Sequence, residues 1–187
     1  MVQKRNKEKS LKMEIILQLI KSENHVREIA KNLEESHVTI SRKLNALQKE
    51  NVVDFEQKGK NKIFKLKKNI IAKNYVFNAE RYKLNQLVKK YAEMLIIADQ
   101  IIKNTTEKLV LIFGSYAKFT SHEDSDIDVY IMNEDKKVKK KLEEIHSKIK
   151  VKLGKFNLNS ELIKEIIKNH VILRGVEEFY ERTKFFD

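Results

Sequence analysis

The stretch Lys108–Met132, which reads KLVLIFGSYAKFTSHEDSDIDVYIM, decides the fold of the C-terminal part of this 187-residue chain. It opens with the continuous apolar run Leu109–Phe113, which has the length of a buried strand. Residues 127–131 then alternate between apolar and polar side chains, a pattern typical of a second strand. We therefore expect two strands, separated by a short helix near 116–120 and a polar loop.

Two carboxylates open the second predicted strand. Side chains in a strand repeat their direction every second residue, so Asp126 and Asp128 are expected on one face. Carboxylates placed in this way repel each other unless a cation lies between them, and a set of oxygen ligands favours Mg²⁺ over Zn²⁺. The alternative interpretation is that 124–128 is only a polar turn at the start of a strand.

Gly114 and Ser115 follow directly after the first predicted strand. A glycine at this point allows a phosphate to approach the backbone closely. The serine hydroxyl and the N–H groups at the start of the short helix can then bind that phosphate. The pair is therefore a candidate nucleotide-binding element.

A strand, Gly-Ser, ten residues and Asp-x-Asp together resemble the nucleotidyltransferase superfamily related to DNA polymerase β. Residues 106–187 are most similar to its minimal archaeal and bacterial members. The resemblance implies that Gly114 and Ser115 bind a nucleoside triphosphate, with ATP expected, and that Asp126 and Asp128 are catalytic residues that hold Mg²⁺. It also implies in-line attack of an acceptor hydroxyl on the α-phosphorus, with release of pyrophosphate.

The sequence departs from that family at two places. Phe119 stands where the family usually has glycine. The family's third carboxylate, often the base for the acceptor hydroxyl, is absent from the strand expected within 150–158. Asn157 or Asn159 can occupy its place, but an amide does not accept a proton. Glu161 lies just beyond and is an alternative acid for the site, although we expect it to cap the next helix. Nucleotide binding is therefore better supported than turnover.

The first seventy residues have a different pattern. Apolar residues recur at helical spacing over 9–20, over 26–33 and again after Ser36, a residue type that favours the N-cap position. Two short strands are expected at 52–55 and 62–66, on either side of a polar loop that contains a glycine. Three helices followed by a basic hairpin is the order of a winged helix-turn-helix.

Residues 28–53 resemble prokaryotic winged-helix transcription regulators, in which the third helix enters the DNA major groove and the wing contacts the backbone. The resemblance implies a DNA-binding set that comprises His37, Thr39, Ser41, Arg42 and Lys43 on the third helix and Lys58, Lys60 and Lys62 on the wing. Arg42 is the best candidate for reading bases, because its planar fork can bind guanine through two hydrogen bonds. The alternative is a winged helix that serves protein contacts or dimerisation.

The charge distribution agrees with a polyanionic partner for the N-terminal part. Basic residues outnumber acidic residues 18 to 9 over residues 1–73, but only 21 to 18 over residues 74–187. Cysteine is absent, which excludes disulfides, zinc–thiolate sites and thiol catalysis. No apolar run is long enough to cross a membrane and no signal peptide is evident, so we expect a cytoplasmic protein without membrane partners.

The predicted architecture is α+β with two domains. It comprises a winged helix-turn-helix at 1–70, a long connecting helix at 71–105, and a nucleotidyltransferase-like domain at 106–187 with a mixed sheet and flanking helices. Within 74–103 the apolar residues repeat every seven positions, which favours a homodimer slightly over a spacer helix within one monomer.

Three functions remain open. The chain is a DNA-binding regulator whose C-terminal domain binds a nucleotide, or a transferase that modifies a protein acceptor, as antitoxins of this family do. The third alternative is a transferase directed at nucleic acid.

Overall fold

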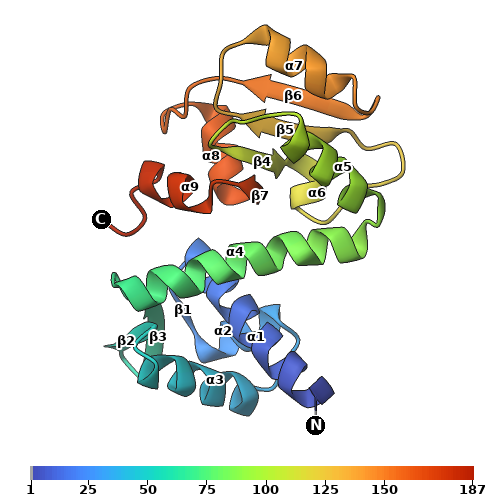
Figure 1. Ribbon diagram of the computed structural model, residues 1–187. Coiled ribbons are helices and arrows are strands. Elements are labelled where there is room, and N and C mark those ends of the chain that lie inside the picture. Colours follow the sequence, from blue (N-terminus) through green and yellow to red (C-terminus); the bar gives the residue numbers. More distant parts are fainter. Residues whose placement is uncertain (1) are drawn as a thin grey trace. The chain divides into compact units, whose positions relative to one another are not determined.

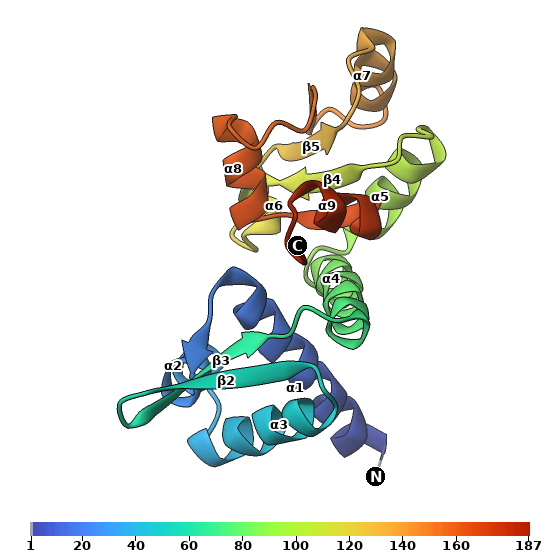
Figure 2. The same ribbon diagram turned by 90° about the vertical axis from the view of Figure 1, so that its left-hand side faces the viewer.

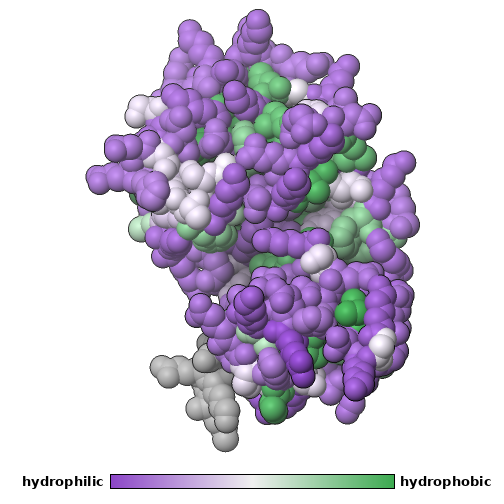
Figure 3. Space-filling view, turned by 180° about the vertical axis from the view of Figure 1, so that it is seen from behind, coloured by the Kyte–Doolittle hydropathy of each residue, from purple (hydrophilic) through white to green (hydrophobic). Residues whose placement is uncertain are grey.

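The computed structural model describes the backbone of residues 2–187 and the side chains of residues 10–187 (Figure 1). The chain forms two compact units: the first extends to Tyr82 and includes Phe186–Asp187, and the second is Lys83–Phe185. Within the described residues no helix is long and apolar enough to cross a membrane. Figure 3 shows that mainly hydrophilic side chains cover the face seen from behind, with smaller apolar patches between them.

The N-terminal unit contains three helices, a short strand, a hairpin and most of a fourth helix. These elements are α1 (Val2–Lys21), β1 (Asn24–His25), α2 (Val26–Asn32), α3 (His37–Lys49), β2 (Val53–Lys58), β3 (Asn61–Leu66) and α4 (Ile70–Lys90). The strands form an antiparallel sheet in the order β1-β3-β2. The three helices and the hairpin predicted from the sequence are confirmed, and β1 is an addition to them.

Local side chains determine where these helices begin. The hydroxyl of Ser36 accepts a hydrogen bond from the backbone N–H of Thr39 at 3.1 Å, which caps α3. The ring of His25 caps α2 in the same way, accepting from the N–H of Glu28 at 3.0 Å. The core beneath them consists of fully buried aliphatic side chains, among them Ile15, Ile16, Ile29, Ile40, Leu44 and Leu47.

The C-terminal unit is built around a four-stranded sheet. Its elements after α4 are α5 (Glu93–Lys103), β4 (Val110–Phe113), α6 (Gly114–Ala117), β5 (Ile127–Ile131), α7 (Lys136–Glu143), β6 (Ile149–Leu153), α8 (Glu161–Lys168), β7 (Val171–Arg174) and α9 (Val176–Arg182). The strand order is β6-β5-β4-β7, with β4 antiparallel to both neighbours and β5 parallel to β6. The expected mixed sheet with flanking helices is therefore confirmed.

The two faces of this sheet differ in chemistry. One face packs against α5 and α7 in a core of buried aliphatic side chains that includes Ile97, Ile101, Val110, Ile112, Val129, Leu142 and Val151. The opposite face carries Asp128 and Tyr130 together with Lys150 and Lys152 of β6, because the register pairs these residues across the two strands. Figure 2 shows β4 running between α8 on one side and α5 on the other. The charged face is therefore the one on which a site can form.

The segment predicted as one helix over 71–105 consists of two helices. α4 ends at Lys90 and α5 begins at Glu93, so Tyr91 and Ala92 interrupt the helix. At this junction the N–H of Met94 donates to the carbonyl of Tyr91 at 2.9 Å, a hydrogen bond that spans three residues instead of four. The sequence did not reveal the interruption, because neither glycine nor proline marks it and the seven-residue repeat continues through it.

The repeat itself is explained by burial within the chain. Leu87, Met94 and Ile101, which share one heptad position, are all fully buried in the core of the C-terminal unit. Side chains that fill their own core do not form a seam with a second copy. The repeat therefore gives no support to a homodimer.

Candidate functional site

The end of β4 and the start of β5 meet at Gly114 and Asp128. The register places Phe113 opposite Asp128, so Gly114 is the first residue beyond the paired strands. Gly114 has a φ of +69°, a left-handed conformation that favours glycine. A Cβ atom on Gly114 would lie 3.2 Å from Cγ of Asp128 and would overlap its Oδ2 oxygen. The glycine therefore makes room for the carboxylate of Asp128, a role that the sequence did not indicate.

Asp126 and Asp128 form a pair of carboxylates in electrostatic contact. Asp128 is half-buried, and Asp126 is exposed just before β5. Burial raises the pKa of Asp128, and the negative charge of Asp126 raises it further. Lys152 and Lys118 oppose this shift, so the pair lies among cations of the chain as well. The structure thus brings together the two residues predicted to hold the metal.

Ser115 lies in the first turn of α6 and is half-buried. Its carbonyl accepts a hydrogen bond from the N–H of Thr120 at 3.0 Å, which closes the turn that follows the short helix. Within the described residues, no hydrogen bond engages the Ser115 hydroxyl. The hydroxyl is therefore available to a ligand.

Phe119 has a φ of +59°, which is the left-handed conformation that glycine adopts without strain. The phenylalanine therefore keeps the backbone that suits the glycine usual at this position, at a cost of about 1 kcal/mol. Its ring is half-buried and packs against the core of the C-terminal unit, which offsets that cost. The carbonyl of Phe119 also accepts a hydrogen bond from Lys90 at 2.5 Å.

The strand predicted to lack an acid is β6, and the residues that it places beside the carboxylate pair are lysines. Lys150 is the register partner of Asp128, and Lys152 is the partner of Tyr130. Asn157 and Asn159 lie after the strand, where the side chain of Asn157 accepts from the N–H of Asn159 at 3.0 Å in a local turn. Neither strand β6 nor this turn supplies a carboxylate.

The acids of α8 occupy different surroundings. Glu161, in the first turn of α8, forms an ion pair with Lys164 at 2.7 Å. Glu165 lies one helical turn later, forms an ion pair with Lys118 at 3.2 Å, and raises the pKa of Asp128. Glu165 is therefore the acid that the tertiary structure brings near the pair. No sequence pattern indicates it, because it lies far along the chain on an ordinary amphipathic helix.

A magnesium ion fits the carboxylate pair. Within the described residues no group of three His, Cys, Asp or Glu side chains is arranged to hold a metal. Mg²⁺ is usually held by one or two carboxylates, with phosphate and water oxygens completing its shell. The half-burial of Asp128 next to a second carboxylate creates the negative charge that such an ion would neutralise. Asp126 and Asp128 therefore suit Mg²⁺ that arrives with a phosphate ligand.

Comparison with known proteins gives a partial match to the same region. Residues 96–178 match the family model Polymerase beta, Nucleotidyltransferase. The matched residues include Gly114, Ser115, Asp126 and Asp128, so this part of the C-terminal unit is similar to a nucleotidyltransferase domain. No curated protein matches the chain. A solved structure described as "Crystal structure of the toxin-antitoxin with AMP-PNP" is 20% identical and covers 56% of this chain and 79% of that one, with a TM-score of 0.33.

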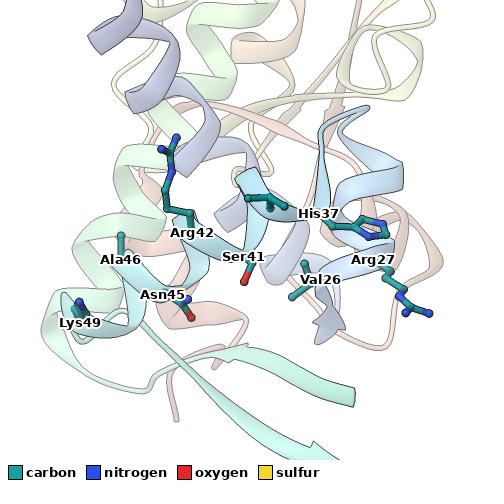
Figure 4. Close-up of a pocket in the computed structure, with 9 residues that line it drawn as sticks. Val26, Arg27, His37, Ser41, Arg42, Asn45, Ala46 and Lys49 are labelled. Carbon is teal, nitrogen blue, oxygen red and sulfur yellow. The ribbon is translucent and has the colours of Figure 1, made fainter. Parts of the chain in front are cut away.

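A second candidate site lies on α3 in the N-terminal unit. A groove of about 810 Å³ is lined by Val26, Arg27, His37, Val38, Ser41, Arg42, Asn45, Ala46 and Lys49. Three of the five residues predicted to face DNA from this helix, His37, Ser41 and Arg42, are among them. Figure 4 shows these lining side chains, with Val26 and Arg27 on α2, the others on α3, and Arg42 directed away from Asn45. Arg27, Asn45 and Lys49 are further polar lining residues that were not predicted from the sequence, although Ser41, Asn45 and Lys49 recur at helical spacing.

The other two predicted residues of α3 have structural roles. The hydroxyl of Thr39 lies 2.8 Å from the hydroxyl of Ser36, so it belongs to the helix cap. Lys43 is only 8% exposed, and its charge lowers the pKa of Glu50. The expectation that Lys43 faces DNA is therefore wrong, because its position falls on the inward face of α3 with Ile40 and Leu44.

The three predicted wing lysines, Lys58, Lys60 and Lys62, are exposed on the β2–β3 hairpin. Gly59 has a φ of +60° at the tip. The ammonium of Lys62 lies 4.1 Å from the ring centroid of Phe55. The hairpin thus presents a cluster of positive charge to solvent.

Proposed function

We propose that this chain is a DNA-binding transcriptional regulator whose nucleotidyltransferase-type domain binds a nucleoside triphosphate with Mg²⁺. The observation that carries the proposal is the position of the Asp128 carboxylate against Gly114, with Asp126 beside it and Ser115 next along the chain. This arrangement joins a candidate metal site to a candidate phosphate site. ATP is the nucleotide that we would test first.

Each residue of the nucleotide site has a proposed role. Asp126 and Asp128 would hold Mg²⁺, which when bound would neutralise the charge of the phosphates. The hydroxyl of Ser115, which no other group of the described chain engages, would donate a hydrogen bond to a phosphate oxygen. Gly114 keeps Asp128 in place because it has no Cβ to displace the carboxylate.

The N-terminal unit supports the DNA-binding part of the proposal. The order of three helices followed by a hairpin with three exposed lysines supports the assignment of a winged helix-turn-helix. The α3 groove combines Arg42 and Arg27 with the amide of Asn45, groups that bind phosphates and base edges. The exposed Val38, 79% accessible, adds an apolar group that suits the methyl of thymine.

The test is a titration of Mg²⁺ and a fluorescent ATP analogue into wild type and into a variant with Asp126→Asn and Asp128→Asn. We expect the wild type to bind only when Mg²⁺ is present, and the double variant to lose that binding. Asp124→Asn is the matched control, because Asp124 is an exposed acid of the same loop. Equal affinity of the wild type and the double variant for the ATP analogue would refute the assignment of Asp126 and Asp128 to the metal site.

Nucleotidyl transfer is a second candidate function, favoured by the approach of Glu165 to Asp128 from α8. A carboxylate there could accept the proton of an acceptor hydroxyl, on a protein or a nucleic acid. Incubation of the chain with α-³²P-labelled nucleoside triphosphates, Mg²⁺ and cell lysate tests this function. A labelled band that disappears with Glu165→Gln, while nucleotide binding remains, would establish transfer. If no label appears although the chain binds nucleotide, the proposed nucleotide-binding DNA regulator is the function that stands.

A further inference from the structure

Strand β6 carries two lysines toward the carboxylate pair. Lys150 and Lys152 pair in register with Asp128 and Tyr130 of the parallel strand β5, so all four side chains leave the sheet on the same face. The position of β6 is fixed at two points. Glu143 accepts the N–H of Val151 at 3.0 Å, and the hydroxyl of Tyr130 donates to the carbonyl of Gly154 at 2.8 Å.

The two lysines differ in what they contact. The ammonium of Lys150 is directed back along the chain, where it donates to the carbonyl of Ser147 at 3.4 Å. Lys152 is exposed, and no hydrogen bond or ion pair joins it to another described residue. Its positive charge nevertheless acts on Asp128 and lowers the pKa of that carboxyl group. Among the described residues of this face, Lys152 is therefore the lysine beside Asp128 whose ammonium makes no hydrogen bond or ion pair.

The second cation near Asp128 is already paired. Lys118, just after α6, forms its ion pair with Glu165 of α8 at 3.2 Å. A triphosphate that binds Mg²⁺ at the Asp pair keeps net negative charge, so it needs a further cation from the protein. An unpaired lysine on a fixed strand meets that need at a smaller cost than a lysine that must first leave a carboxylate.

We propose that Lys152 is a phosphate-binding residue of this face, and that its ammonium contacts the triphosphate of the nucleotide held at Gly114, Ser115, Asp126 and Asp128. This inference rests on the proposed nucleotide binding and names the group that recognises the phosphate chain. It also assigns opposite roles to two neighbouring lysines on one strand. Lys152 binds the ligand, and Lys150 does not.

The experiment measures the dissociation constants of Mg-ATP and of AMP for the full chain by isothermal titration calorimetry. The variants are Lys152→Ala, Lys152→Arg and the matched control Lys150→Ala. Loss of one charge-assisted hydrogen bond corresponds to an affinity about tenfold weaker. We expect this loss for Mg-ATP with Lys152→Ala, a much smaller change for AMP, and near wild-type affinity with Lys152→Arg and Lys150→Ala.

The outcomes separate this inference from the proposed function. If the wild type binds Mg-ATP and Lys152→Ala binds it equally well, the inference is overturned and the nucleotide site stands. The inference is also overturned if Lys150→Ala weakens binding as much as Lys152→Ala, or if ATP and AMP lose affinity equally. If the wild type binds no nucleotide, both the proposed function and the inference fail.

Discussion

The substitution Gly114→Ala tests the geometry of the candidate site most directly. Alanine at this position adds a Cβ atom 3.2 Å from Cγ of Asp128 and in overlap with its Oδ2 oxygen. Two costs follow. The left-handed φ of +69° costs an alanine ~1 kcal/mol, and forcing the carboxylate aside costs ~1–3 kcal/mol. We therefore expect the free energy of unfolding of the C-terminal unit to fall by ~2–4 kcal/mol.

A double-mutant cycle separates the two costs. In an Asp128→Ala background the carboxyl group is gone and the two Cβ atoms lie 3.4 Å apart, a distance that ordinary contact tolerates. Gly114→Ala should then cost only the ~1 kcal/mol of backbone strain. Gly59→Ala is an independent control, because Gly59 has a similar φ of +60° with nothing within 4 Å of the added atom.

The assay is urea denaturation followed by tyrosine fluorescence and by hydrogen exchange of β4 and β5 amides, which reports on the C-terminal unit alone. The reasoning would be refuted if Gly114→Ala cost the same free energy in the wild-type and Asp128→Ala backgrounds. Glycine would then be required only for its backbone conformation. In that case Gly114→Ala should also leave Mg-ATP binding intact, whereas displacement of Asp128 should abolish it.

Two further predictions concern single side chains. Arg42→Ala should weaken binding to the preferred DNA duplex by ~1–3 kcal/mol. The control Lys31→Ala, on the exposed part of α2 outside the groove, should not weaken it. Equal losses of affinity for the two variants in a fluorescence anisotropy titration would show that the base contact does not come from α3. Asp128→Asn should stabilise the unliganded C-terminal unit at pH 7. Folding raises the pKa of Asp128, so its carboxyl group binds a proton more tightly in the folded state than in the unfolded state. The free energy of unfolding therefore falls as the pH rises from the ordinary pKa of 3.8 through the pKa of the folded state. Urea denaturation as a function of pH should show this fall in the wild type and not in Asp128→Asn. A wild type that is more stable than Asp128→Asn at neutral pH would contradict the prediction.

Local pattern was sufficient for most of the fold. Alternation predicted β5, the apolar run predicted β4, and helical spacing with Ser36 as a cap predicted α3, because each of these signals depends on neighbours within a few residues. The interruption at Tyr91–Ala92 could not be predicted in this way. It is associated with an edge-to-face contact between the rings of Tyr91 and Tyr116 at 5.0 Å, and with a hydrogen bond from the Tyr116 hydroxyl to Glu93 at 2.6 Å. These contacts join residues more than twenty positions apart.

The candidate site, like the fold, could be predicted only where its residues lie close together in the sequence. Gly114, Ser115, Asp126 and Asp128 lie within fifteen positions, so their spacing could be read from the sequence. Lys152 and Glu165 reach Asp128 only through the parallel pairing of β6 and the packing of α8, which no local pattern encodes. The burial of Lys43 was also missed, because the sequence does not state which side of α3 faces the core.

The electrostatics of Asp128 support the proposal that this carboxylate serves a ligand. Burial and the charge of Asp126 both disfavour its ionised form, while Lys152 and Lys118, the latter already in an ion pair with Glu165, oppose that effect. An asparagine would fit the same space beside Gly114 without that penalty. A sequence selected for stability alone has no reason to keep two adjacent acids here. In the proposed site, a bound cation that carries a phosphate ligand would remove this penalty, and Lys152 would face that ligand.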